Sequence, residues 1–456
     1  MVEIEKIVSL CKRRGFIYPG SEIYGGFANS YTYGPYGAQL KKNIKDLWWK
    51  TFVESRRDMV GIDGQILLHP KTWVASGHVE GFNDALVDCK KCKARHRADH
   101  LIEKALDIEA EGLTEADLTK LIDENDIKCP KCGERDFTEV RSFNLMFQTE
   151  LSKTKDDQNI AYLRPETAQA IFLEFKNVID TTRVVVPFGI GQIGKAFRNE
   201  ITPGNFIFRL IEFEQMEIEY FIHEKNWEET FRHWLAEQHR WCELIGLRPS
   251  NISEYEHPLE KLSHYSKRTV DIMYDFPFGK SELYGLAYRT DFDLTQHQDH
   301  SGKQLQFRDP HSNETFVPHV IEPTWGVERS LLAILCDAYH EEQLEGGEER
   351  VVMKFNKAIA PVQIAVLPLM KKDGLAEKSD EITTELSRDW NVEYDDGGSI
   401  GKRYRRQDEI GTPFCLTVDY DTLEKDNSVT IRDRDTMEQV RVAIDDLNAW
   451  FREQLG

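Results

Sequence analysis

The stretch from Gly189 to Phe221 constrains the fold of this chain more than any other segment. Its Thr202-Pro203-Gly204-Asn205 tetrapeptide is typical of a turn, because proline fixes the second position and glycine tolerates a positive φ at the third. We therefore predict two flanking strands, in which alternate side chains share a face. If no bulge intervenes, one face is polar (Arg198, Glu200, Arg209, Gln215, Glu217 and Glu219) and the other is apolar (Phe208, Leu210, Met216, Ile218 and Tyr220).

The predicted polar face differs from an ordinary solvated surface, because it lacks lysine, serine and threonine. Arginine suits bidentate binding of phosphate, and carboxylates suit an ammonium group. A half-solvated antiparallel hairpin is the plainer alternative. Gly189, Gly191 and Gly194 also have dinucleotide-binding spacing, but only eight residues separate Gly194 from Pro203, too few for the helix that this fingerprint requires.

Four of the eight cysteines form two close pairs, Cys89-x-x-Cys92 and Cys129-x-x-Cys132. Two-residue gaps let each pair close on one tetrahedral Zn²⁺, so the spacing predicts a zinc ribbon with a structural metal ion. The alternative is four buried cysteines in chance spacing. The other four are isolated and are expected in the core: Cys11, Cys242, Cys336 and Cys415.

The 456 residues are enough for two or three domains. The net charge of -21 argues, taken alone, against a polyanion partner, and the densest basic cluster is Lys402–Arg406. No apolar run approaches the roughly 18 residues of a membrane span. The N-terminal segment lacks the apolar region of a signal peptide, so we expect no membrane association and a cytoplasmic location.

Phe197-Arg198-Asn199-Glu200, a turn, Arg209 and a carboxylate-rich strand together resemble motif 2 of class II aminoacyl-tRNA synthetases. The sequence from Glu212 to Glu219 is most similar to that of glycyl-tRNA synthetases of the homodimeric type. An apolar helical stripe from Leu40 to Phe52, followed by a strand ending at Pro70, resembles motif 1, through which the class dimerises.

Gly326-x-x-Arg329, where a strand runs into a helix, resembles motif 3. An arginine in the first turn of a helix lies where backbone N–H groups favour phosphate. Glu328 stands where the families commonly have a small residue.

Three further segments resemble signatures of the glycyl family. Arg164-Pro165-Glu166-Thr167-Ala168-Gln169, which we expect to open a helix, matches a signature whose glutamate lines the amino-acid pocket. Ser281–Asp291 resembles a strand that carries an ATP-side carboxylate, here Glu282. Arg97-Ala98-Asp99-His100 is similar to a stretch whose arginine reaches the active site.

The resemblance implies an α+β protein with an antiparallel-sheet catalytic domain over residues 1–355. That domain would contain a zinc-ribbon insertion at 84–140 and a second insertion at 222–310, between motifs 2 and 3. An α/β anticodon-binding domain would occupy residues 356–456. There we expect strands at 362–367, near Val392 and at 414–418, and helices at 376–390 and 443–455.

The implied reaction joins glycine to tRNA(Gly) through glycyl-adenylate, with ATP and Mg²⁺, in a homodimer. By resemblance Arg198 would hold the α-phosphate and the attacking carboxylate, and Arg329 the γ-phosphate; these two are the implied catalytic residues. Phe213 would lie on the adenine face, Glu200 at its edge, and Glu282 would support Mg²⁺. The implied ATP-binding set is Arg198, Asn199, Glu200, Phe208, Arg209, Phe213, Glu282, Leu283, Gly326 and Arg329.

The implied glycine pocket is rich in carboxylates, which can surround an ammonium group. Thr324 matches a hydroxyl position beside the α-carbon. Some of these acids could instead pair only with nearby arginines. The implied glycine-binding set is Arg97, Glu166, Phe213, Gln215, Glu217, Glu322 and Thr324.

Two other classes of function have to be weighed. A non-catalytic relative, such as the accessory subunit of a mitochondrial DNA polymerase, keeps the architecture without the activity, but the joint presence of Arg198, Glu217, Glu322 and Arg329 argues against it. A zinc-ribbon nucleic-acid-binding module attached to an unrelated enzyme is the other, and motifs on both sides of the cysteines argue against that.

Overall fold

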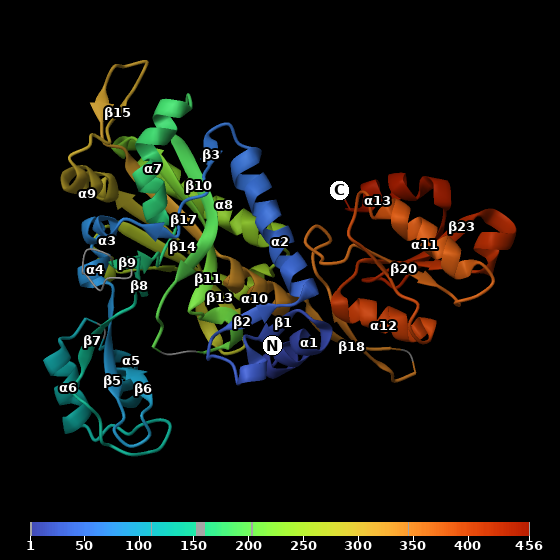
Figure 1. Ribbon diagram of the computed structural model, residues 1–456, viewed down its shortest axis with the longest axis horizontal. Coiled ribbons are helices and arrows are strands. Elements are labelled where there is room, and N and C mark those ends of the chain that lie inside the picture. The colour runs from blue at the N-terminus through green and yellow to red at the C-terminus, as the bar shows by residue number, and fades with distance from the viewer. Residues whose placement is uncertain (1, 111, 152–159, 202–203, 345, 456) are drawn as a thin grey trace.

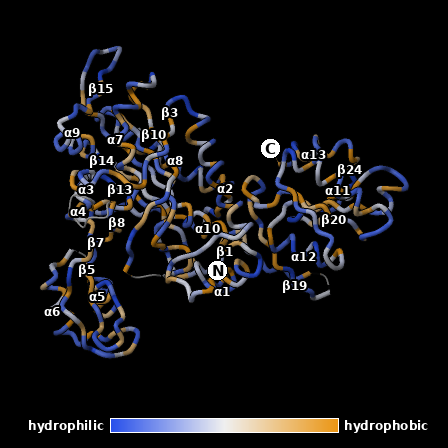
Figure 2. The backbone as a smooth tube through the Cα atoms, viewed as in Figure 1, coloured by the Kyte–Doolittle hydropathy of each residue, from blue (hydrophilic) through white to orange (hydrophobic). Residues whose placement is uncertain are grey.

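The computed structural model describes residues 2–110, 112–151, 160–201, 204–344 and 346–455 (Figure 1). A large body carries a small projecting lobe, and a further domain formed by the C-terminal part of the chain lies on the other side of it. Apolar segments concentrate inside the body and inside that domain, whereas the projecting hairpins are hydrophilic (Figure 2). None of the helices in these ranges is both long and apolar enough to cross a membrane.

The body is built on a seven-stranded sheet with the order β12-β13-β14-β17-β11-β10-β3. Neighbouring strands are antiparallel, except that β3 runs parallel to β10. The strands are β3 (Met59–Gly61), β10 (Phe188–Phe197), β11 (Glu212–Ile222), β12 (Ile252–Glu256), β13 (Arg268–Phe276), β14 (Gly279–Thr290) and β17 (His319–Gly326).

Three helices cover one face of this sheet. Alternation along β11 sends Met216, Ile218 and Tyr220 into the largest apolar core, as the sequence predicts. Helical spacing places Ile44 and Trp48 of the second helix opposite them. The covering helices are α2 (Pro35–Trp49), continued by the π-helical turn η2 (Lys50–Glu54), α8 (Trp227–Leu244) and α10 (Val327–Ala338).

The other face of the sheet is only partly covered. The helices α7 (Ala168–Thr181) and α9 (Phe292–Ser301) pack there against Phe188, Ile190 and Phe221. Beyond them the same face of β11 continues with Glu219, Glu217 and Gln215. Glu217 and Gln215 line a cavity at this polar end of the sheet, and a ligand can reach them there.

Smaller elements surround the body. The N-terminal segment forms α1 (Ile4–Arg14), β1 (Ile17–Pro19), η1 (Glu22–Tyr24) and β2 (Tyr31–Tyr33). A three-stranded sheet joins β4 (Leu67–Leu68), β9 (Ile160–Leu163) and β8 (Gln148–Glu150), beside α3 (Pro70–Ala75) and α4 (His78–Gly81). Two hairpins pair β15 (Phe307–Arg308) with β16 (Thr315–Phe316), and β18 (Tyr339–Gln343) with β19 (Glu349–Met353). Short helical turns are η4 (Phe206–Phe208), η5 (Glu224–Asn226), η6 (Pro249–Asn251) and η7 (Leu259–Lys261).

The projecting lobe has its own small core, in which Val87, Ile102 and Leu118 are buried. Its strands pair in the order β6-β5-β7, and both cysteine pairs lie in it. Its elements are β5 (Asn83–Asp88), β6 (Arg95–Arg97), α5 (Ala98–Leu106), α6 (Glu115–Glu124) and β7 (Arg141–Asn144).

The C-terminal part of the chain forms a five-stranded sheet with the order β21-β20-β22-β23-β24, parallel among its first three strands. Its strands are β20 (Ile364–Pro368), β21 (Val392–Tyr394), β22 (Phe414–Val418), β23 (Ser428–Asp433) and β24 (Gln439–Ala443). Its helices are α11 (Leu375–Leu386), α12 (Ile400–Ile410) and α13 (Leu447–Leu455), with the turns η8 (Thr422–Asp426) and η9 (Ile444–Asp446).

Two sequence predictions about the sheet need correction. The predicted strands stop short of the turn, because β10 ends at Phe197 and β11 begins at Glu212, so Arg198, Glu200 and Arg209 lie between the strands and not in them. Thr202 and Pro203 of the predicted turn lie outside the described residues. The segment 222–310, expected as an insertion, contributes β12, β13 and β14 to the main sheet, because their apolar alternation matches the same core.

Smaller differences concern helix limits. Arg164, Pro165 and Glu166 precede α7, which begins at Ala168, so the signature forms the approach to a helix. In the C-terminal part, α12, β23 and β24 were not predicted, and α12 contains the basic cluster Lys402–Arg406.

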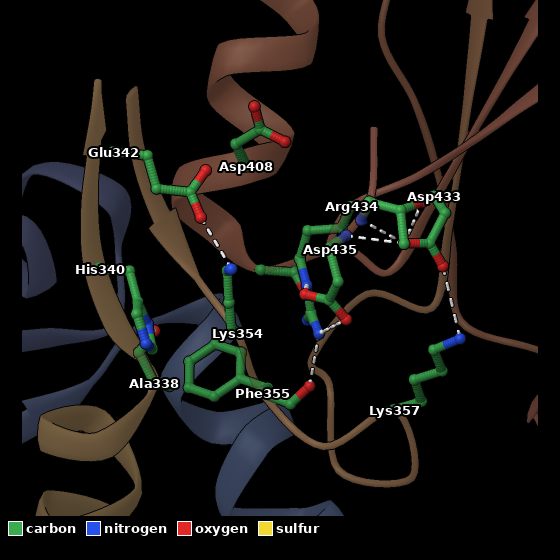
Figure 3. A network of polar contacts seen from close by, with 12 residues as sticks. Ala338, His340, Glu342, Lys354, Phe355, Lys357, Asp408, Asp433, Arg434 and Asp435 are labelled. Carbon is green, nitrogen blue, oxygen red and sulfur yellow. Dashed lines mark hydrogen bonds and ion pairs between the residues drawn. The ribbon is translucent and has the colours of Figure 1, made fainter. Parts of the chain in front are cut away.

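A chain of polar contacts joins β18 and β19 to the C-terminal sheet (Figure 3). Lys354 pairs with Glu342 at 2.7 Å. Arg434 donates to the carbonyl of Phe355 at 2.8 Å and pairs with Asp435 at the same distance. The segment that links the two parts is therefore held to both.

Two buried arginines share one carboxylate at this junction. Arg350 of β19 is fully buried and donates two hydrogen bonds of 2.8 Å to Asp408 of α12. Arg432 of β23 donates to the same carboxylate at 2.9 Å. Burial alone would raise the pKa of Asp408, but the two guanidinium groups outweigh it and lower that pKa.

Asp408→Asn should loosen this junction strongly, because it removes the carboxylate that two buried guanidinium groups share. Arg432 is then left without an ion pair among the described residues, and Arg350 keeps only Glu342. We expect a loss of about 3–5 kcal/mol in the free energy of local opening. Hydrogen exchange of the α12 amides measures this free energy. The control is Asp426→Asn, which removes an exposed partner of Arg441 and should have a much smaller effect, because water screens an exposed ion pair. Equal effects in the two variants would contradict the assignment to burial.

Candidate active site

A cavity of about 280 Å³ opens on the uncovered end of the main sheet. Its floor comes from β11, β14 and β17, and its rim from Arg198, Glu200, residues 207–210 and the start of α10. Basic residues lie toward the rim and buried carboxylates toward α7 and α9. The residues that line it include Glu166, Arg198, Glu200, Phe208, Arg209, Phe213, Gln215, Glu217, Tyr265, Glu282, Leu283, Arg289, Glu322, Thr324, Gly326 and Arg329.

Arg198 lies between two aromatic rings. Its guanidinium carbon is 5.3 Å from the ring centres of both Phe82 and Phe213. Its Nε donates to the carbonyl of Pro165 at 3.0 Å. Aromatic contact on two sides with one backbone anchor fixes the plane of the guanidinium and leaves its terminal N–H groups for a planar anion.

Arg329, in the first turn of α10, stands over Phe208 with its guanidinium carbon 4.5 Å from the ring centre. It pairs with Glu282 of β14 at 3.0 Å, and this pairing lowers the pKa of Glu282. An arginine, a helix N-terminus and a carboxylate in one corner can hold a phosphate together with a divalent cation.

Glu328, the residue next to Arg329, is buried at the edge of the cavity and is bonded to the protein on the side of α2 and β11. Its carboxylate accepts from Lys41 of α2 at 2.6 Å and from the Glu214 N–H at 2.8 Å. The glutamate that replaces the usual small residue of motif 3 therefore ties α10 to α2 and β11.

The opposite end of the cavity holds carboxylates from three elements. Glu217 is 2% exposed and accepts hydrogen bonds from the hydroxyl groups of Thr167 and Thr324, the second at 3.0 Å. Glu322 accepts from Arg289 at 2.8 Å. Glu166 lies 3.2 Å from His78.

Burial and mutual repulsion shift the titration of these acids. Burial, opposed by Arg289, raises the pKa of Glu322 to about 8. Burial and the nearby Glu166 raise the pKa of Glu217. Burial alone would raise the pKa of Glu166 too, but His78 and Arg289 outweigh it and lower that pKa. Glu166 is therefore the ionised carboxylate of the three, and a bound cation would favour ionisation of Glu217 and Glu322 as well.

The comparisons with known proteins agree along the whole chain. Residues 147–338 match the tRNA synthetase class II core domain (G, H, P, S and T), residues 105–145 match the glycyl-tRNA synthetase insertion domain 1, and residues 363–454 match the anticodon binding domain. The glycine–tRNA ligase of Clostridium tetani is 55% identical over 99% of this chain and 98% of its own. The chain belongs to the glycyl-tRNA synthetase family.

Two further glycine–tRNA ligases are similar over nearly their whole length. The protein of Bacillus anthracis is 53% identical over 100% of both chains. That of Caldanaerobacter subterraneus subsp. tengcongensis is 54% identical over 100% of this chain and 99% of its own. The class II resemblance and the α+β fold are thereby confirmed, and nothing supports an accessory subunit of a DNA polymerase.

The structure brings most of the predicted site residues of this synthetase-family chain into the one cavity, with two exceptions. Arg97 lies on β6 in the projecting lobe, where it pairs with Asp99 and, at 3.2 Å, with Asp84. Asn199 donates its N–H to the carbonyl of Leu145 at 2.8 Å. Neither residue lines the cavity as described. Phe208, predicted on the apolar face, lines the cavity because it lies on η4 and not on a strand.

Sequence reasoning did not single out Arg289, which organises the acidic end. This arginine is 2% exposed, bonds Asp293 at 2.7 and 2.8 Å and Glu322 at 2.8 Å, and stacks 3.9 Å from the ring centre of Tyr265. An arginine near the end of an apolar strand, with an aspartate four residues later, is the signal that could have indicated Arg289 as a site residue.

The paired cysteines of the lobe come together as one cluster. The Sγ atoms of Cys89 and Cys132 are 3.6 Å apart, as are those of Cys92 and Cys129, and all four lie within 4.8 Å of one another. Four thiolates at about 2.3 Å from one tetrahedral Zn²⁺ would be separated by about 3.8 Å. The donor set and spacing therefore fit zinc, which would hold the two turns of the lobe together.

Purified protein should contain about one equivalent of Zn²⁺ by metal analysis, because four thiolates in tetrahedral spacing bind this ion tightly. Cys92→Ser should lose most of the metal. Cys336→Ala, which changes an isolated core thiol, should keep it. A metal-free parent with four freely titrating thiols in the lobe would contradict the assignment.

Proposed function

We propose that this chain catalyses the ATP-dependent ligation of glycine to tRNA(Gly). The observation that carries the proposal is one cavity with arginines at one end and buried carboxylates at the other. The first end suits the phosphates of ATP, and the second suits an ammonium group with little room around it. ATP–pyrophosphate exchange with each of the twenty amino acids tests it, and exchange should depend on glycine alone.

The first step would join the glycine carboxylate to the α-phosphorus of ATP. A carboxylate oxygen forms the new bond to phosphorus, and the bond to the bridging oxygen breaks as pyrophosphate leaves with its electron pair. Positioning and charge stabilisation are sufficient for such a step, so no nucleophilic side chain is needed. Arg198, fixed between Phe82 and Phe213, would stabilise the charge that develops on the α-phosphate.

ATP would bind at the arginine end. Arg329 would hold the γ-phosphate, Phe213 would lie against the adenine ring and Glu200 would bind its edge. Glu282, beside Arg329, would support Mg²⁺, which neutralises phosphate charge when bound.

The second step would transfer glycine to the tRNA. The oxygen of a terminal ribose hydroxyl would form a bond to the glycyl carbonyl carbon, and the bond from that carbon to the phosphate oxygen would break. AMP would leave with the electron pair of that bond, and its phosphate would take up the hydroxyl proton. The domain over residues 356–456 would bind the anticodon, with α12 and its basic residues as the candidate surface. Residues 1–355 would form the catalytic domain, including the zinc lobe at 84–140.

A homodimer is part of the proposal. The segment around η1 exposes three large apolar side chains, Ile23, Tyr24 and Phe27, at 88%, 87% and 74%. Such a cluster favours contact with another protein surface. A second copy of the chain would cover this apolar cluster near motif 1. The enzyme would work in the cytoplasm.

Arg198→Ala should lower the rate of glycine-dependent exchange at least about a hundredfold, because the lost contact strengthens as charge develops in the transition state. The KM for ATP should change much less. The control is Arg183→Ala, which removes an exposed arginine outside the cavity and should leave the rate unchanged. Near-parental exchange in the Arg198 variant would contradict the role given to this residue.

Glu217→Ala and Glu322→Ala should each raise the glycine KM at least about thirtyfold, because the ammonium loses a buried counter-charge. Exchange assays at varied glycine concentration measure this. Glu254→Ala, an exposed change on β12, is the matched control. Normal glycine affinity in both cavity variants would remove the physical basis of the glycine assignment.

Thr324→Gly should relax the exclusion of alanine. A pocket that only attracts distinguishes one methylene by about 1–3 kcal/mol, and glycine is the smaller ligand, so alanine has to be excluded by crowding. Removing this side chain opens space beside Glu217. The ratio of kcat/KM for glycine over alanine should fall by about ten- to a hundredfold. An unchanged ratio would mean that other groups exclude the methyl.

A further inference from the structure

Glu219 of β11 is a buried acid that the reaction described above does not use. It shares a face with Glu217 and Phe221, and so lies between the acidic end of the cavity and the apolar layer under α7. Its exposed fraction is 0%, and it is not among the residues that line the cavity. Within the described parts of the chain, neither of its carboxyl oxygens has a hydrogen-bond partner.

The surroundings of Glu219 are crowded with charge. One carboxyl oxygen from each of Glu217, Glu219 and Glu322 lies within 4.8 Å of the others. Arg289 from β14 and Asp293 from α9 also act on it, while β10 offers Ile190 directly across the strand pair. Arg289 already donates to Asp293 and Glu322.

An ionised Glu219 would be a further buried anion with no donor to stabilise it, which is strongly unfavourable. Burial and the nearby Glu322 accordingly raise the pKa of Glu219 well above its ordinary range. A neutral carboxylic acid differs from a carboxylate in one useful way, because its hydroxyl can donate a hydrogen bond.

The neighbour best suited to accept that hydrogen bond is Glu322. Both oxygens of Glu217 already accept from threonine hydroxyl groups, Oε2 from Thr167 and Oε1 from Thr324. Glu322 accepts from Arg289 through Oε1, which leaves acceptor capacity on its carboxylate.

We propose that Glu219 is a positioning residue for the amino-acid ammonium group: as a neutral acid behind the cavity, it donates to Glu322 and holds that carboxylate toward the ligand. The inference rests on the proposed function. When the ammonium group binds and favours ionised Glu322, the proton stays on Glu219. Glu322 is thus negatively charged at the cavity surface while Glu219 behind it stays neutral.

The same three carboxylates could instead hold a metal ion. The guanidinium of Arg289, 2.8 Å from Glu322, opposes a second buried cation there. A metal would also compete with the ammonium group for Glu217 and Glu322. We therefore treat the metal ion as an outcome that the test has to distinguish.

The test compares Glu219→Gln with Glu219→Met in the full-length protein. Glutamine is neutral and keeps a donor, whereas methionine fills a similar volume without one. Exchange assays should show the glycine KM of the Gln variant within about threefold of the parent, and that of the Met variant raised about ten- to a hundredfold. The KM for ATP should stay close to the parental value in both.

Gln192→Met is the matched control. Gln192 lies across from Glu217 on β10, is fully buried, and likewise has no partner for its side chain in the described residues. This variant makes the same polar-to-apolar change beside the pocket and should leave the glycine KM unchanged. A rise like that of Glu219→Met would show a general packing effect and overturn the proposal.

Three other outcomes overturn it. A glycine KM raised more than about tenfold in Glu219→Gln would mean that the negative charge is what counts, and this variant decides alone if Glu219→Met does not fold. A parental KM in Glu219→Met would mean that the acid has no role. A bound cation in the parent, beyond zinc, that is lost in Glu219→Gln would make the cluster a metal site. A parent without glycine-dependent exchange would instead overturn the proposed function itself.

Discussion

The buried ion pairs of Arg289 are the interaction on which the catalytic body depends. Four acids lie around this arginine on two strands and one helix: Glu217, Glu219, Glu322 and Asp293. Without a cation among them, these acids could stay buried only in the neutral form, because each ionised carboxylate would lose its hydration without compensation. Arg289 balances part of the charge, and the remainder favours a cationic ligand. The polar end of the sheet is thus unstable alone and complementary to an ammonium group.

The other features of the sheet keep this polar end in place. Arg164, 2% exposed, donates to the carbonyls of Lys195, Gly64 and Gln65, and so fixes the approach to α7 from which Glu166 reaches the cavity. Gly194 is required for that contact, since a Cβ there would lie 2.1 Å from the Arg164 guanidinium. The glycines that resembled a dinucleotide fingerprint therefore allow neighbouring side chains to pack closely against β10.

Sequence alone predicted the elements whose pattern is local. The alternation in β11, the cysteine spacing and the strand over Phe414–Val418 all follow from neighbours in the chain. What it missed depends on distant contacts. The sequence placed Arg198 in a strand, but β10 ends before it, and Arg198 contacts Phe82, Phe213 and the Pro165 carbonyl. Phe82 and Pro165 come from distant segments, so the local sequence could not reveal them as neighbours. The membership of 268–290 in the main sheet is equally non-local.

Charge placement explains why the two ends of the cavity differ in kind. Arg198 follows the end of β10, and Arg329 lies in the first turn of α10. Both are partly exposed and contact aromatic rings, so their guanidinium groups are held in place for the charge that would develop in the proposed reaction. The carboxylates of Glu217 and Glu322 stand on strands of the central sheet, are buried and bonded to fixed hydroxyl groups and one arginine. A rigid end suits recognition by size, because crowding discriminates only where the surrounding atoms cannot retreat. In the proposed reaction, the sheet would therefore select the smallest amino acid, and the arginines at the rim would promote turnover.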